Sequence, residues 1–296
     1  RIGNRELAWM FENCFPNALD TAVDFSDAGA RPDTFVASSE VDAMWLRDSA
    51  AQVWPYLPLM KNDSNLQQLI AGVINRQTRC ILKDPYANAF CRDDSQVSPW
   101  KSDLTGMKPG VHERKWALDS LCYPIRLAHG YWKASSDRSP LDAAWREAIL
   151  RVLKTLREQQ RMTSPGPYTF QRRTEAQANT VAGDGYGRPS KPVGLICSMF
   201  RPTDDATVFP FLVPSNLFAV VSLRQAGGYP ERYAEAVMPL ERAAEAMPDD
   251  VGVRLALGWC YKRVGRIELA IDALEQTLLI APNDAMLRYN LACYLS

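Results

Sequence analysis

A repeat with a period of 34 residues in the last quarter of the chain restricts its fold more than any other feature of the sequence. Residues 232–248 align with 266–282, and the same shift aligns Leu257 with Leu291. The first alignment pairs these identical residues: Arg232 with Arg266, Ala236 with Ala270, Leu240 with Leu274, Glu241 with Glu275 and Pro248 with Pro282. Periods of about 20–50 residues are typical of units that bury their apolar faces only by stacking on one another. The period therefore predicts antiparallel helices near 231–246, 250–263, 266–280 and 284–295.

One complete unit of this period, residues 250–282, resembles the tetratricopeptide repeat. It contains L-G-W-C-Y at 257–261, and A-P-N-D follows at 281–284. The resemblance implies a short helical solenoid whose concave face holds a protein partner. We expect its helices to pack through these side chains: Ala236, Leu240, Leu257, Tyr261, Ala270, Leu274 and Leu291. Only one full helix pair is present, with one helix before it and one after, where at least three repeats are usual.

The composition changes at Gly227-Gly228, from a sequence rich in tryptophan and proline to one rich in Ala, Leu, Glu and Arg. We therefore predict a first domain over 1–228 and the repeat segment over 229–296. Apolar residues at helical spacing precede this point in five segments: 5–23, 41–57, 64–83, 112–132 and 140–162. A further helix is expected after Pro214, and long irregular stretches occupy 84–112 and 163–200. Little of the sequence alternates between apolar and polar residues, as half-buried strands do. We therefore expect an all-α fold, with the helix at 5–23 facing the core.

Charge and cysteine content limit the classes of partner and compartment. Lys plus Arg equals Asp plus Glu at 34 each, so the chain has no net field that attracts nucleic acid or an anionic membrane. No apolar run approaches the about 18 residues of a membrane span. The seven cysteines are scattered and lack C-x-x-C spacing, as is typical of reduced thiols in the cytoplasm rather than of a disulfide or zinc framework. We therefore expect a cytoplasmic protein that binds neither nucleic acid nor membrane.

Two adjacent carboxylates, Asp204 and Asp205, lie in an otherwise aromatic and apolar stretch next to Arg201. An ionised carboxylate is costly to bury unless it is paired or protonated, so these residues are candidates for an acid with an altered pKa. The alternative is a short helix that Thr203 caps, with both aspartates in its first turn. Pro210 and the following prolines limit such a helix, which favours an ordered loop.

The segment V-D-A-M-W-L-R-D-S at 41–49 sets Trp45, Arg47 and Asp48 among apolar residues. Carboxylates accept hydrogen bonds, guanidinium donates them and indole rings stack on C–H faces, which is suited to a sugar. The alternative to a sugar site is a helix in the core, with an internal Arg–Asp ion pair and tryptophans that pack in the core. Charges again precede an apolar helix at Glu113 and Arg114. No histidine follows His112 at zinc-site spacing, so both histidines are interpreted as structural.

Three ordered segments together resemble glycoside hydrolase family 125: D-A-M-W-L-R-D-S-A-A-Q-V-W-P-Y-L (42–57), E-R-K-W-A-L-D-S-L-C-Y-P-I-R-L (113–127) and F-R-P-T-D-D-A-T-V-F-P-F-L-V-P-S-N-L-F-A (200–219). The resemblance implies an exo-α-1,6-mannosidase with an (α/α)6 barrel that inverts configuration, without a metal or other cofactor. It also implies a general acid at Asp204 or Asp205, with some preference for Asp204. The implied contacts to a terminal mannose are Trp45, Arg47, Asp48, Glu113, Arg114 and Arg201.

The chain departs from the family pattern in two places. Ala117 stands where an acidic residue is usual, and the family's general base is a glutamate from a later part of the barrel. At Gly227 the sequence instead changes to repeats, after about half of the twelve barrel helices. We therefore expect impaired hydrolysis, and an open site whose acid has a pKa too little raised for work near neutral pH. The alternative function is a non-catalytic repeat scaffold or a carbohydrate-binding remnant.

Overall fold

The computed structural model describes residues 2–38, 41–227 and 230–295. The chain divides into two compact units, 1–223 and 224–296, which we describe separately. Helices account for 54% of the structure and strands for 7%, so the prediction of a mostly helical chain is confirmed. The predicted boundary at 228–229 lies outside the described residues. Within the described part of the chain, no helix is both long and apolar enough to cross a bilayer.

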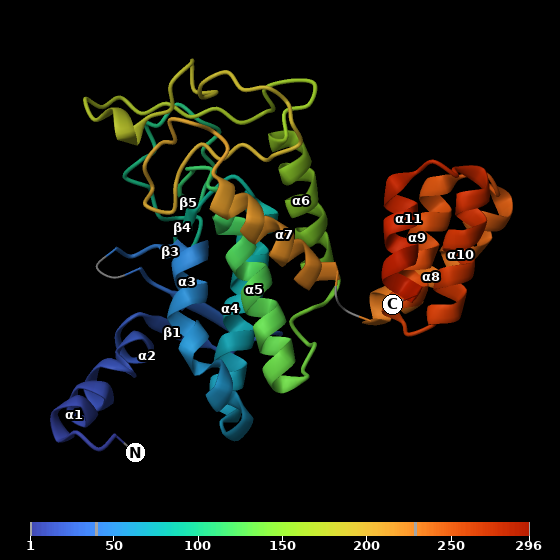
Figure 1. The fold of residues 1–296 in the computed structure, drawn as a ribbon. Coiled ribbons are helices and arrows are strands. Elements are labelled where there is room, and N and C mark those ends of the chain that lie inside the picture. The colour runs from blue at the N-terminus through green and yellow to red at the C-terminus, as the bar shows by residue number, and fades with distance from the viewer. Residues whose placement is uncertain (1, 39–40, 228–229, 296) are drawn as a thin grey trace. The chain divides into compact units, whose positions relative to one another are not determined.

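The first unit is built on three long helices that pack side by side, α4, α5 and α6, with α3 against α5 (Figure 1). The bounds of its helices are α1 (Arg5–Cys14), α2 (Asn17–Thr21), α3 (Leu46–Val53), α4 (Ser64–Lys83), α5 (Leu118–Ser135), α6 (Ala143–Gln159) and α7 (Val213–Gly227), of which α7 ends beyond the unit. Two 3-10 helices are η1 (Trp54–Asn62) and η2 (Gln177–Asn179). The long loops gather at the end of the bundle where α4 and α6 end and α5 begins (Figure 1).

The mostly helical structure also contains short strands, which the all-α prediction did not include. The strands are β1 (Val23–Ser26), β2 (Asp33–Val36), β3 (Met44–Trp45), β4 (Ala89–Phe90) and β5 (Val111–Glu113). β1 pairs with β2, and a second antiparallel sheet has the order β3-β4-β5. Strands of two to four residues are too short to show alternation in the sequence. The second sheet ties the residues before α3 to those before α5, which positions both helix starts.

Helix α4 confirms the prediction over 64–83. Asp63 caps it by accepting hydrogen bonds from the backbone N–H of Asn65 and Leu66, at 3.0 Å each. Its buried face includes Ile70 and Ile74, which are fully covered. At Gly72 the helix approaches β2 so closely that an added Cβ would meet backbone atoms of β2 at 3.0 Å. The absence of a side chain at Gly72 therefore sets the distance between α4 and this strand.

The predicted helix at 5–23 breaks at Pro16 into α1 and α2, and its core-facing assignment is wrong. No residue of α1 is buried, and the side chains of Leu7, Met10 and Phe11 are about half exposed, at 55%, 48% and 50%. Figure 1 shows α1 extending away from α3, α4 and α5. Periodicity predicted the helix correctly, but it cannot show whether a partner element covers the apolar stripe.

The second unit consists of antiparallel helices that match the repeat prediction closely: α8 (Pro230–Ala246), α9 (Val251–Arg263), α10 (Ile267–Ile280) and α11 (Ala285–Leu295). Its core contains Leu257, Tyr261, Ala270 and Leu274, each less than a tenth exposed. Ala236 and Leu240 pack against this core. The 34-residue period thus predicted the helix positions and six of the seven packing residues, whereas Leu291 is only half-buried and does not belong to this core.

Candidate active site

Asp204 lies in a loop that closes on itself before α7. Phe200 and Ala206 form an isolated antiparallel bridge, and the backbone N–H of Arg201 donates to the carbonyl of Asp205 at 2.8 Å. Asp204 has a φ of 60°, a left-handed conformation that aspartate tolerates better than most residues. The aspartates therefore lie on an ordered loop, as predicted, and no helix begins at Thr203.

The loop directs its two adjacent carboxylates differently. Asp205 accepts hydrogen bonds from Arg201 Nη2 at 3.0 Å and from Thr203 Oγ1 at 2.8 Å, within the loop itself. The side chain of Arg201 is 51% exposed. Asp205 and Arg201 thus pair with each other rather than with the other candidate site residues.

Asp204 instead faces groups from three distant segments. Its Oδ1 accepts from Asn88 Nδ2 at 3.3 Å and lies 3.8 Å from Arg47 Nη2. Lys115 Nζ donates to its backbone carbonyl at 2.9 Å. Burial raises the pKa of Asp204 to about 6, and the negative charge of Glu113 adds to the rise, while Arg47 and Lys115 oppose it. The pKa of Asp204 is thus raised, although it stays below neutral pH.

Arg47, in the first turn of α3, extends its guanidinium across three carboxylates. Nε lies 3.1 Å from Asp48 Oδ1 and Nη1 lies 3.3 Å from Asp119 Oδ2, while Nη2 faces Asp204. Burial alone would lower the pKa of Arg47, but the three carboxylates together raise it. Ser38 Oγ donates to the second oxygen of Asp48 at 2.9 Å. Arg47 thus lies between Asp48 and Asp204.

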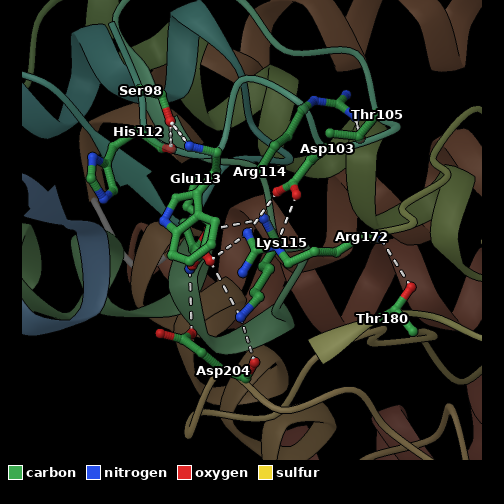
Figure 2. Close-up of polar contacts among 12 residues, drawn as sticks. Ser98, Asp103, Thr105, His112, Glu113, Arg114, Lys115, Arg172, Thr180 and Asp204 are labelled. Carbon is green, nitrogen blue, oxygen red and sulfur yellow. Dashed lines mark hydrogen bonds and ion pairs between the residues drawn. The ribbon is translucent and has the colours of Figure 1, made fainter. Parts of the chain in front are cut away.

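Glu113 is the centre of a second charged cluster at the end of β5. It lies 3.3 Å from Lys115 Nζ and accepts from Arg172 Nη2 at 3.0 Å and from Asn88 Nδ2 at 3.0 Å. Figure 2 shows Glu113 among these cations, with the Lys115 ammonium between Glu113 and Asp204. Asn88 donates to both carboxylates, so it joins the two clusters.

Arg114 points away from this cluster, contrary to its assignment as a sugar contact. Its Nε donates to Asp84 Oδ2 at 2.7 Å. Its Nη1 donates to Thr105 Oγ1 at 2.8 Å (Figure 2). Its guanidinium carbon also lies 5.3 Å from the ring centres of Tyr86 and Tyr168. Side chains alternate along extended backbone, so Glu113 and Lys115 share one side while Arg114 takes the other.

Trp45 lies at the edge of the site with its ring centre 5.3 Å from that of His112. Its indole nitrogen is buried and has no hydrogen-bond partner among the described residues, and the same is true of Asp119 Oδ1. Burial raises the pKa of Asp119, opposed by Arg47, and burial lowers the pKa of His112. Buried polar atoms are usually hydrogen-bonded, so the Trp45 and Asp119 atoms are exceptions within the described part of the chain.

Sequence reasoning missed several residues of the site. Asn88 and Arg172 lie in the long loops after α4 and α6, and Lys115 and Asp119 flank the start of α5. The charges at 115 and 119 are visible in the sequence but had no assigned role, and the irregular stretches 84–112 and 163–200 had no named site residue. No group of His, Cys, Asp and Glu within the described ranges is arranged to hold a metal ion.

Taken together, the site offers a carboxyl of pKa about 6, an arginine fork and several carboxylate oxygens on three converging segments. A carboxyl with such a pKa can hold a proton near pH 6 and release it to a leaving group. The surrounding donors and acceptors are of the kind that bind vicinal hydroxyls. The arrangement therefore supports acid catalysis on a carbohydrate.

Comparison with known proteins agrees with this chemistry. The family model of metal-independent α-mannosidases, glycoside hydrolase family 125, matches residues 4–255, and a tetratricopeptide-repeat model matches 229–292. The two matches overlap over 229–255. In Schizosaccharomyces pombe, the meiotically up-regulated gene 157 protein is 36% identical over 249 residues, which is 75% of this chain and 47% of the relative.

A solved relative is the metal-independent α-mannosidase of Streptococcus pneumoniae, in a non-productive complex with α-1,6-mannobiose. The match has a TM-score of 0.69 and 33% sequence identity, and it covers 88% of this chain. The chain spans about half the length of these relatives, 47% of one and 57% of the other. On the extent of the family match, the chain belongs to glycoside hydrolase family 125, the metal-independent α-mannosidases.

Proposed function

We propose that the chain binds the terminal mannose of an α-mannoside and presents Asp204 as the proton donor to the glycosidic oxygen. The observation that carries the proposal is the meeting of Arg47, Asn88 and Lys115 at Asp204, whose pKa is raised to about 6. Family membership and the α-1,6-mannobiose bound to the pneumococcal relative support the choice of sugar. Neither the proton donor nor the sugar contacts need a metal or other cofactor.

In the proposed site, Arg47 and Asp48 hold hydroxyl groups of the mannose, and Trp45 of the same motif contacts its ring. Glu113 keeps Lys115 and Arg172 in place, because both cations lie within 3.3 Å of it. Asp205 and Arg201 instead stabilise their own loop, and Arg114 stabilises the core through Asp84. We assign these roles because the side chains of these three residues do not contact Asp204 or its partners.

For the fold, we infer that α3 to α7 correspond to part of an (α/α)6 barrel, in a first domain over 1–228 that the repeat segment over 229–296 follows. The TM-score of 0.69 with the pneumococcal relative and the repeat match at 229–292 support this division. The compact units, 1–223 and 224–296, divide the chain within a few residues of it.

We further infer that the chain by itself hydrolyses α-1,6-mannosides poorly. Inversion requires a second carboxylate about 6.5–9.5 Å from the acid, with room for a water between them. Glu113 pairs with two cations, and Asp119 and Asp48 both pair with Arg47. Each of these nearby carboxylates is therefore already bound in an ion pair. General acid catalysis alone contributes only about 10²–10⁴-fold.

Calorimetric titration with α-1,6-mannobiose, mannose and glucose tests the binding proposal. We expect the mannosides to bind and glucose to bind more weakly. Arg47→Lys should weaken mannoside binding about tenfold, because an ammonium cannot span three carboxylates as a guanidinium fork does. Arg151→Lys, on the exposed face of α6, is the matched control. Equal binding of mannose and glucose, or equal effects of the two substitutions, would contradict the proposal.

Mannose release from α-1,6-mannobiose tests the inferred impairment. We expect the purified chain to release mannose only slowly. If the chain releases it rapidly and Asp204→Ala abolishes the release while Asp205→Ala does not, Asp204 is the acid and a base is present in this chain. That result would leave the proposed sugar and acid intact and refute the impairment.

A second candidate function is protein binding by the repeat segment. A cavity of about 340 Å³ lies between α8, α9 and α10 and is lined by Leu269 and Gln276 among others. Panning of a peptide library against the chain tests it. Leu269→Asp should reduce peptide capture, whereas Leu279→Asp, at an exposed position outside the cavity, should not. Capture that both substitutions leave unchanged would argue against this function.

A further inference from the structure

A cavity of about 580 Å³, called here the Arg161 cavity, lies among the loops that follow α6. Residues 161–165, directly after the helix, line one part of it, and most residues of 183–190 line the other. Arg161 Nη1 donates to the Tyr186 carbonyl at 2.6 Å and so joins the two stretches. Pockets for small molecules typically have volumes of about 300–1,000 Å³. The Arg161 cavity is therefore large enough for a molecule of the size of a sugar.

The loop at 183–187 forms an ordered wall of this cavity. The backbone N–H of Tyr186 donates to the Gly183 carbonyl at 3.0 Å, and that of Gly187 donates to the Ala182 carbonyl at 2.9 Å. Gly183 has a φ of 60°, and a Cβ added there would lie 2.6 Å from the Gly187 carbonyl oxygen. The wall thus keeps its shape, and at Gly183 a ligand meets backbone rather than a side chain.

Arg161 brings a half-buried guanidinium to the cavity without a carboxylate beside it. Its Nε and Nη2 donate to Gln159 Oε1 at 3.3 and 3.2 Å, and Nη2 also donates to Met199 Sδ at 3.4 Å. Within the described residues, no Asp or Glu forms an ion pair with it. Burial lowers the pKa of Arg161, and the groups that oppose this effect are a thiol and three tyrosines. An anion would stabilise a partly buried positive charge whose partners are all neutral.

The other polar side chains of the cavity favour a phosphate joined to a hydroxylated group. Arg188 is exposed there and forms no ion pair with the part of the chain that the structure describes. Asp184 is the one carboxylate among the described lining residues, so two guanidinium groups outnumber it. The hydroxyl groups of Thr163, Ser164 and Ser190 also line the cavity. Guanidinium forks match phosphate oxygens, and hydroxyl groups donate to and accept from the hydroxyls of a sugar.

We propose that the Arg161 cavity binds a sugar phosphate, with Arg161 and Arg188 at the phosphate and the three hydroxyl groups at the sugar. Because an isolated phosphate would fill only a small part of about 580 Å³, the ligand carries a further group. Among the contacts described for Asp204, none comes from a residue that lines this cavity. The site is therefore additional to that of the proposed function and does not depend on it.

Calorimetric titration of the full chain with glucose 6-phosphate, inorganic phosphate and glucose tests the proposal. We expect glucose 6-phosphate to bind most tightly, inorganic phosphate to bind about tenfold more weakly, and glucose to bind more weakly than either. The affinity for glucose 6-phosphate should fall as the salt concentration rises, because salt screens the pairing of charges. Equal binding of glucose 6-phosphate and inorganic phosphate, or no binding of either, would overturn the proposal.

Substitutions in the cavity should act in opposite directions. Arg161→Gln should weaken the binding of glucose 6-phosphate about tenfold or more, and Arg188→Gln about threefold, because Arg188 is exposed. Asp184→Asn should strengthen it about threefold, and asparagine tolerates the left-handed φ of 54° at this position. The matched control is Arg146→Gln, on an exposed position in the first turn of α6 and outside the cavity. Equal effects of Arg161→Gln and Arg146→Gln would contradict the assignment.

Two further results keep the test decisive. Arg161→Gln also removes hydrogen bonds to Gln159 and Tyr186, so the loop itself is disturbed in that variant. If Arg188→Gln and Asp184→Asn both leave the affinity unchanged, the cavity is not the binding site, whatever Arg161→Gln does. Saturating α-1,6-mannobiose should not displace glucose 6-phosphate, and competition between them would overturn the proposal. Failure of the mannobiose to bind would refute the proposed function and leave this inference standing.

Discussion

The Asp204 carboxyl lies where its charge is disfavoured, and this property has a cost in stability. Its pKa in the folded chain, about 6, is above the ordinary value of 3.8. Because the folded state holds the proton more tightly than the unfolded state, stability is lost as the pH rises from about 4 to 6, and the loss is complete above that range. The difference in pKa corresponds to about 3 kcal/mol.

Asp204→Asn should therefore stabilise the first unit, and more so at high pH. We expect its free energy of unfolding to exceed that of the parent by up to about 3 kcal/mol at pH 8 and by less than about 1 kcal/mol at pH 4. Urea unfolding at both pH values measures this difference. Asp205→Asn, which removes an exposed ion pair, should change stability by less than about 1 kcal/mol at pH 8. An equal gain for Asp204→Asn at both pH values would contradict the assignment.

At the scale of elements, the first unit depends on the close contact between α4 and β2. Thr34 Oγ1 of β2 donates a hydrogen bond to the Leu69 carbonyl of α4 at 2.7 Å, so the strand lies directly on the helix backbone. A Cβ at position 72 would overlap Thr34 and backbone atoms of β2. Gly72→Ala should thus destabilise the chain by about 1–3 kcal/mol, although alanine favours helix.

Gly258→Ala in α9 is the contrasting substitution for this prediction. There an added Cβ meets its nearest neighbours at 3.5 Å, an ordinary contact. We expect no loss of stability, or a gain of up to about 1 kcal/mol from the lower entropy of the unfolded chain. Denaturant unfolding of both variants checks the pair, and similar effects at the two glycines would show that α4 and β2 can separate at little cost.

At the scale of the whole molecule, the proposed ligand belongs to the first unit alone. Calorimetric unfolding should show two transitions, of which only one shifts upward with α-1,6-mannobiose. At 100 times the dissociation constant, the expected stabilisation is about 2.7 kcal/mol. Leu274→Ala, in the fully buried core of the repeat segment, should lower only the other transition, by about 2–5 kcal/mol. A single transition that both changes shift would contradict two independently unfolding units.

Local sequence predicted what depends on contacts close in the chain. Helix α4 and the four repeat helices were predicted within a few residues, because periodicity and caps act over one or two turns. The family resemblance placed Arg47 and Asp204 in one site, and in the structure their side chains lie 3.8 Å apart. The three-stranded sheet was missed because its strands have two or three residues each and pair across 20 or more positions.

The sequence by itself determined the family, the repeat segment and the two aspartates from which an acid could be chosen. Only the tertiary structure distinguished them, since the left-handed turn at Asp204 directs one carboxylate to Arg47 and Asn88 and leaves the other with Arg201. It also turned Arg114 toward Asp84 and brought in Asn88 and Arg172 from distant loops. The physical reason is that the pKa and partners of a side chain depend on charges and burial contributed by segments far apart in the chain, whereas sequence patterns report only neighbours along it.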